Sequence, residues 1–114
     1  MSDPIVKWPF GEASVAALTA TGDQAIALAN DMTIINGATT QATGNRTINL
    51  TIGAGVGVGA MIVAKLKTNG TETTTFGTGF TAPVMTGVAG KTKVVSFIYD
   101  GTSFIQTGTA VQLD

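Results

Sequence analysis

The chain has 114 residues and a formal net charge of −1, and it contains neither histidine nor cysteine. Without these two residues the usual nucleophile–base pairs, disulfide bonds and sulfur- or imidazole-ligated metals are excluded, so we expect no enzyme, no metal and no cofactor. Only 11% of the residues are charged, against roughly 25% in an average soluble domain, and the absence of a basic stripe argues against nucleic acid as a partner.

The first segment, Met1–Ser14 (MSDPIVKWPFGEAS), is expected to form an extended N-terminal arm. Pro4 and Pro9 fix φ and bias the residues before them toward extended conformations. Three alternatives are open for the arm: it folds back onto its own subunit as a first edge strand, it crosses to a neighbouring molecule, or it is disordered. Its candidate contact residues are the four large apolar side chains Ile5, Val6, Trp8 and Phe10.

Residues 15–114 are expected to form a single all-β domain. Short apolar segments recur about every dozen residues with turn signals between them, as an all-β sandwich or barrel requires. The clearest strand is Arg46–Ile52, in which Ile48, Leu50 and Ile52 share one face. The other face carries Thr47, Asn49 and Thr51. This alternation predicts a half-buried strand with one polar face.

The longest uncharged stretch, Thr47–Ala64, is not expected to span a membrane. Asn49 and the glycines of Gly53–Gly59 interrupt it, and its apolar residues alternate as in a strand. The glycines also resemble a dinucleotide-binding loop, but such a loop needs a helix after it, whereas a strand is expected near Ala60. No secretory signal is visible at the N-terminus.

Two turn signals predict β-hairpins. Asn69-Gly70 is expected to turn the strand that ends at Lys67 back into Thr71–Phe76, and Asp100-Gly101 is expected to join the two apolar runs of Thr92–Gly108. Both dipeptides suit two-residue type I′ turns, in which both central residues have positive φ. We therefore predict φ > 0 for both glycines.

The strand Val94–Tyr99 has two largely apolar faces. Val95, Phe97 and Tyr99 are expected on one face, and the opposite face carries Val94, Ser96 and Ile98. Met61–Leu66 shows the same pattern more weakly. In a small domain an apolar outer face is most simply explained by contact with another subunit in a closed symmetric oligomer. Val94 and Ile98 are therefore candidate interaction residues.

Three segments in succession resemble the small β-structured modules of tailed-bacteriophage virion proteins. They are TGNRTINLTI (Thr43–Ile52), GAMIVAKLKTNGTETTTFGTGF (Gly59–Phe80) and VVSFIYDGTSFIQTG (Val94–Gly108). Modules of this kind occur in head decoration proteins, head fibres and fibre tips. The resemblance implies a small antiparallel β-sandwich or jelly-roll-like domain, a homotrimer, and a place on the virion after assembly in the host cytoplasm.

Two roles follow from the resemblance. In the first, the chain is a capsid decoration protein that binds the major capsid protein of the assembled capsid as a trimer and stabilises it, with Met1–Ser14 as the contact to the shell or to a neighbour. In the second, it is a tail- or head-fibre tip module that recognises a host surface glycan or protein. A length of 114 residues favours the first role, because a complete fibre also needs an attachment region and a shaft.

Overall fold

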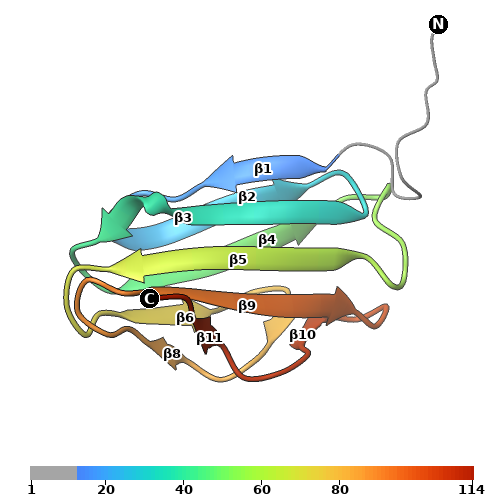
Figure 1. Cartoon of the computed structure of the whole chain (residues 1–114). Coiled ribbons are helices and arrows are strands. Elements are labelled where there is room, and N and C mark those ends of the chain that lie inside the picture. The colour runs from blue at the N-terminus through green and yellow to red at the C-terminus, as the bar shows by residue number, and fades with distance from the viewer. Residues whose placement is uncertain (1–12) are drawn as a thin grey trace, which may run out of the picture.

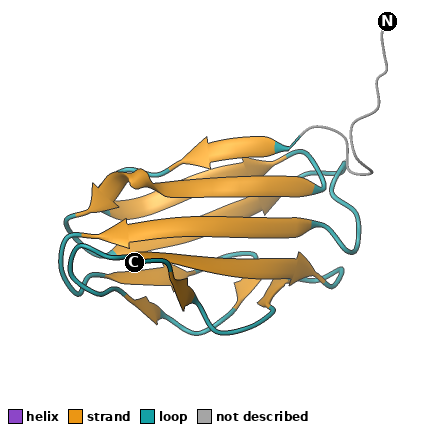
Figure 2. Cartoon of the chain, in the orientation of Figure 1, coloured by secondary structure: helices purple, strands orange, loops and turns teal. Residues whose placement is uncertain are grey.

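The structure, a computed structural model, describes residues 13–114. Within this range the chain forms strands joined by loops, as Figure 2 shows, and no helix that could cross a membrane. The all-β character is thus confirmed. The strands are β1 (Ser14–Ala17), β2 (Gly22–Leu28), β3 (Met32–Ala42), β4 (Arg46–Ile52), β5 (Met61–Thr68), β6 (Thr73–Phe76), β7 (Phe80–Thr81), β8 (Met85–Thr86), β9 (Thr92–Tyr99), β10 (Phe104–Gln106) and β11 (Val111–Gln112).

The strands form two sheets that stack face to face (Figure 1). The large sheet has seven strands in the order β1-β3-β5-β9-β10-β7, with β11 also paired to β9, and the small sheet has four strands in the order β2-β4-β6-β8. The apolar core lies between them and draws on both sheets. Its largest apolar side chains, each under 2% exposed, are Phe97, Phe104, Ile35, Ile48, Ile62 and Leu66.

Strand direction differs from the expectation. The chain passes from one sheet to the other at each of the steps β1–β2, β3–β4 and β5–β6, so that successive strands of the same sheet are parallel. The first six strands therefore wind as three coils of a two-sheet solenoid. Antiparallel pairs appear only later, where β9 pairs with β5, β10 and β11 and where β8 pairs with β6.

The prediction of an antiparallel sandwich or jelly-roll-like domain is thus wrong in its strand direction, because a jelly roll is built from antiparallel strands and these sheets are mixed. The physical cause lies in the connections. A short turn that reverses the chain within one sheet gives an antiparallel pair, whereas here most early turns carry the chain across the core to the opposite sheet.

Asn69-Gly70 is such a crossing, and the hairpin predicted there is wrong. The strand before it, β5, belongs to the large sheet, and the strand after it, β6, belongs to the small sheet. Asn69 donates its N–H to the carbonyl of Ala42 at 2.8 Å, and Gly70 donates its N–H to the Glu72 carboxylate at 2.6 Å. Gly70 is also not among the glycines with positive φ. The dipeptide forms a corner between the sheets.

The hairpin between β9 and β10 is confirmed, but the prediction that Asp100 and Gly101 are the two central residues of its turn is wrong by one residue. β9 and β10 are antiparallel, with Tyr99 opposite Phe104. Asp100 donates its N–H to the carbonyl of Ser103 at 3.1 Å, so the chain reverses about Gly101-Thr102. Gly101 has a φ of 99°, as predicted. The Asp100 carboxylate accepts the N–H groups of Thr102 and Ser103 at 2.8 and 2.9 Å.

The alternation predicted for two strands is confirmed. In β9, Val95 and Phe97 are buried in the core, whereas Val94 and Ile98 are partly exposed. In β4, Ile48 is fully buried. Phe97 also packs against two other aromatic rings, with ring centroids 4.9 Å from Phe76 and 4.8 Å from Phe80. The inner face of the strand therefore holds the centre of the core.

Arg46, the first residue of β4, is a core residue that the sequence analysis did not single out. It is 1% exposed. Its guanidinium donates to the carbonyls of Thr19, Gly37, Thr40 and Lys67 at 3.1 to 3.3 Å. These carbonyls belong to the β1–β2 turn, to β3 and to β5. One side chain thus ties together backbone from all three coils at one end of the core.

Candidate interaction surface

The outer face of the large sheet gathers most of the partly exposed apolar side chains. Register partners on adjacent strands share a face. These apolar side chains therefore lie in continuous rows across five strand pairs: β1–β3, β3–β5, β5–β9, β9–β10 and β9–β11. We call this set the apolar face. Its members are Val15, Met32, Ile34, Met61, Val63, Val94, Ile98, Ile105 and Val111.

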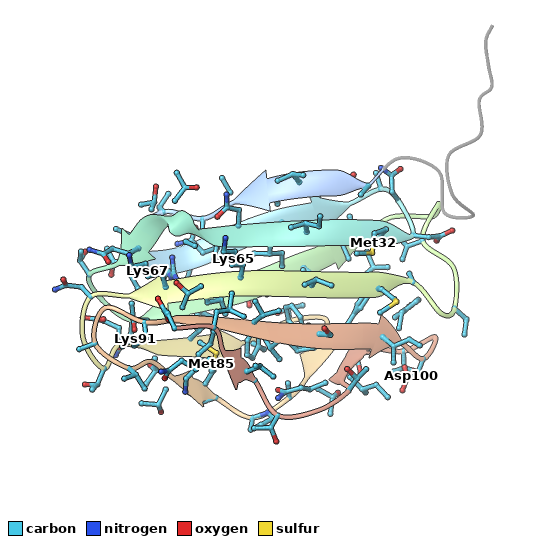
Figure 3. All side chains as sticks on the ribbon, viewed as in Figure 1. Met32, Lys65, Lys67, Met85, Lys91 and Asp100 are labelled. Atoms are coloured by element: carbon cyan, nitrogen blue, oxygen red, sulfur yellow. The ribbon has the colours of Figure 1, made fainter. Side chains whose placement is uncertain are left out.

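Two members of the apolar face are largely exposed, Val15 at 68% and Val111 at 60%, and Ile105 is about one-third exposed at 36%. The other six are half-buried by their neighbours on the sheet. Two lysines of β5, Lys65 and Lys67, occupy one end of the same face, while Met32 lies toward the other end (Figure 3). The face is therefore apolar over most of its length and basic at one end.

The apolar face is large enough for a specific contact. β1, β3, β5, β9, β10 and β11 have 4, 11, 8, 8, 3 and 2 residues. At about 3.3 Å per residue and about 4.8 Å between strands, they cover roughly 570 Å² on one copy. Two such faces in contact would bury about 1,100 Å², just above the roughly 1,000 Å² that a specific interface should exceed. Single exposed apolar residues are normal on a protein surface, whereas a continuous apolar patch of this size indicates an interaction site.

The two predicted interaction residues of β9 lie together on this face. Val94 is paired with Val111 and with Lys65, and Ile98 is paired with Met61 and Ile105. The sequence analysis missed the contributions of β1, β3, β10 and β11. The run Met32–Ile35, apolar at three of its four positions, carried the same two-faced signal as β9 and could have indicated β3.

The other predicted interaction residues, Ile5, Val6, Trp8 and Phe10, lie outside the described residues. Ser14, taken as the last residue of the arm, is the first residue of β1, and Asn30 donates its side-chain N–H to the Ser14 hydroxyl at 2.6 Å. A deletion intended to leave β1 intact must therefore end before Ser14.

A second surface feature is a groove of about 270 Å³ between the segment before and within β8 and the segment between β10 and β11. Its floor and walls include Pro83, Val84, Met85 and Ala110. Lys93 borders the groove, but its ammonium donates to the carbonyl of Thr86 at 3.0 Å. The groove therefore offers apolar contact and no free charged group from this lysine.

The acidic side chains of residues 13–114 are scattered over the domain. No three acidic side chains in this part of the chain lie close enough together to hold a metal ion. The carboxylate with a shifted pKa, Asp100, owes it to its turn: the N–H groups of Ser103 and Thr102 hold the pKa of that carboxyl below its usual range. These hydrogen bonds stabilise the turn, and Asp100 itself is exposed to solvent.

Comparison of the chain with protein-family models, with curated proteins and with solved structures gives no match. The function must therefore be argued from the surface just described and from the composition of the chain.

Proposed function

We propose that this chain is a structural protein of a tailed-bacteriophage virion, a decoration protein that binds the assembled capsid as a homotrimer and stabilises it. The observation that carries the proposal is the apolar face, which leaves nine apolar side chains on one outer surface of a small, weakly charged domain. A surface of this kind is stable in water when it is covered by another protein.

A closed trimer would bury the apolar face of every subunit. Three flat sheets that turn their faces toward a common three-fold axis enclose an apolar core between them, and each subunit then makes the same contacts. Ile98 lies on β9, with β5 on one side and β10 on the other, so it is well inside the face. Lys65 lies at the basic end, where the three like charges can remain in solvent.

The proposed contact with the major capsid protein is the N-terminal arm, with Ile5, Val6, Trp8 and Phe10 as its apolar anchors. The arm is joined to β1, which forms one edge of the large sheet. In a trimer built on the apolar face, this edge lies at the margin of the subunit contact. An arm that starts there is well placed to reach a neighbouring subunit or the capsid surface beneath the trimer.

The attachment is tested with particles from which the protein has been stripped. The unaltered chain should rebind them, and a chain that lacks Met1–Glu12 should still fold and form the same oligomer, with a nearly unchanged melting temperature, yet fail to bind. A matched control replaces Trp8 and Phe10 by alanine in the full-length chain and should reduce binding in the same direction. Undiminished binding of the truncated chain would rule out the arm as the anchor.

The alternative role is a fibre-tip module that recognises a host surface glycan or protein, for which the groove beside Val84 and Ala110 offers a concave surface. Glycan sites commonly use exposed aromatic rings, and all aromatic side chains of residues 13–114 are buried or half-buried. Tyr99, for example, stacks on Phe104 with ring centroids 4.9 Å apart. We therefore favour the decoration role. Binding of the purified oligomer to host cells, but not to capsids, would favour the tip.

A further inference from the structure

The edge strands at the two sides of the sheets differ in length. At one end the sheets finish with β7 and β8, each only two residues long. At the other end they finish with β1 and with the seven-residue strand β2 (Figure 1). All seven residues of β2 pair with β4 on one side, and no strand within residues 13–114 pairs with its other side.

This edge lacks the usual protection against pairing with another chain. Natural edge strands are commonly short, bulged, or guarded by proline or lysine. β2 has the sequence GDQAIAL and keeps a continuous register with β4. Its only charged residue is Asp23. The side chains on its outward face beyond Asp23 are the small, exposed Ala25 and Ala27, which leave the backbone accessible.

We infer that β2 is a second interaction surface, at which the open edge of β2 pairs in antiparallel register with β2 of another copy of this chain. A two-fold axis through Ala25, the middle residue of the strand, places each Ala25 opposite its counterpart and each Asp23 opposite an Ala27. The two Asp23 carboxylates then lie roughly 13 Å apart along the ribbon, at about 3.3 Å per residue. The contact is isologous and carries no opposed like charges.

A second copy of β2 fits this edge better than the N-terminal segment of the same chain. Proline has no N–H to donate and is confined to strand ends, bulges, or edge-strand positions at which its nitrogen faces solvent. Because Pro4 and Pro9 are five residues apart, a regular strand would turn one of the two nitrogens toward β2. Pro4 and Pro9 leave only the four residues Ile5–Trp8 between them. Those four could cover about half of a seven-residue edge, whereas β2 itself matches it in length.

The β2 contact is independent of the apolar face, because β2 belongs to the small sheet and the apolar face to the large one. Both contacts can therefore form in the same assembly, and β2 would then join one oligomer to the next. The inference holds whether or not the apolar face makes a trimer, since it concerns only the pairing of two subunits.

The test uses two charge variants of the full-length chain, Ala25→Lys and Ala25→Glu, with native mass spectrometry as the readout. Each variant alone places like charges opposite each other at the two-fold axis and should lower the mass of the assembly to that of the oligomer without β2 contacts. An equimolar mixture should restore the mass, because an ammonium group then faces a carboxylate. Thr51→Lys is the control: it adds the same charge to the same outer face, but on β4, an inner strand that lies between β2 and β6, and should leave the mass unchanged.

Amide hydrogen exchange gives a second readout, since the outward N–H groups of Gln24–Ala27 should exchange more slowly in the unaltered chain than in Ala25→Lys. An unchanged mass for both charge variants, or a mixture that fails to reassemble, would overturn the inference. It would also be overturned if the unaltered chain showed no association at β2 but acquired one, sensitive to Ala25→Lys, when Met1–Glu12 was removed. That result would show that the chain covers this edge with its own N-terminal segment.

Discussion

Arg46 and Thr74 are register neighbours on the parallel strands β4 and β6, and each carries a buried polar atom without a hydrogen-bond partner, the Nε of the arginine and the Oγ1 of the threonine. The remaining guanidinium nitrogens of Arg46 are well occupied by four backbone carbonyls. Burial lowers the pKa of Arg46, and the Glu72 carboxylate opposes this shift. The guanidinium remains a cation, because arginine is not deprotonated in proteins.

Replacing Arg46 with methionine should destabilise the fold by at least about 2 kcal/mol, because it leaves several backbone carbonyls in the core without their donor. Arg46→Lys should recover only part of the loss, since one ammonium group cannot reproduce the planar fork of donors. Equilibrium unfolding in urea measures both changes. Thr74→Val is the matched control: it removes a hydroxyl that has no partner and should be neutral or slightly stabilising. A methionine variant as stable as the unaltered chain would show that the four carbonyls do not depend on Arg46.

Replacing Ile98 with aspartate in the Ala25→Lys variant, in which the β2 contact is also broken, should release monomers, because it places a charge in the middle of the apolar face at a cost of several kcal/mol when buried. Light scattering at micromolar concentration measures the mass. Thr51→Asp, which adds the same charge on the outer face of the small sheet, should leave the oligomer intact. A stable monomer for the unaltered protein at the same concentration would refute the proposed contact.

Replacing Gly101 with valine should destabilise the protein by more than about 1 kcal/mol, because a β-branched residue is strained at positive φ. The φ of Gly101 is 99°. Gly108→Ala serves as the comparison, since Gly108 has an ordinary φ and open space where a Cβ would lie. That change should be close to neutral or stabilising. Thermal unfolding of the two variants checks the difference, and equal melting temperatures would contradict it.

Asp100 should make the hairpin less stable in acid. Hydrogen bonds from the N–H groups of Ser103 and Thr102 lower the pKa of its carboxyl in the folded chain. A group with a lowered folded pKa contributes stability above its unfolded pKa of about 3.9 and loses that contribution as the pH falls through the folded value. Asp100→Asn should lack this contribution, so its stability difference from the unaltered chain should shrink below about pH 4. A difference that stays constant from pH 7 to pH 3 would show that the carboxylate is not involved.

Local features of this protein could be predicted from its sequence, because they depend on a few adjacent residues. The alternation of β4 and β9 follows from the two-residue period of a strand, and the structure confirms which side chains of β9 are buried. The positive φ of Gly101 follows from the needs of a tight turn. The same two-residue period places Arg46 on the inward face with Ile48, so the burial of Arg46 could have been predicted from the strand pattern. Its charge, in contrast, favours an exposed position.

The partner of each strand was decided only by the tertiary structure. Asn69-Gly70 has the composition of a hairpin turn. Its two N–H groups nevertheless donate to the Ala42 carbonyl and the Glu72 carboxylate, and the chain crosses to the other sheet. Nothing within the dipeptide distinguishes these outcomes, because the choice depends on core contacts between residues far apart in the sequence. The same contacts make the early strands parallel and surround the guanidinium of Arg46 with carbonyls from three coils. They also assemble the apolar face from strands that are far apart in the sequence.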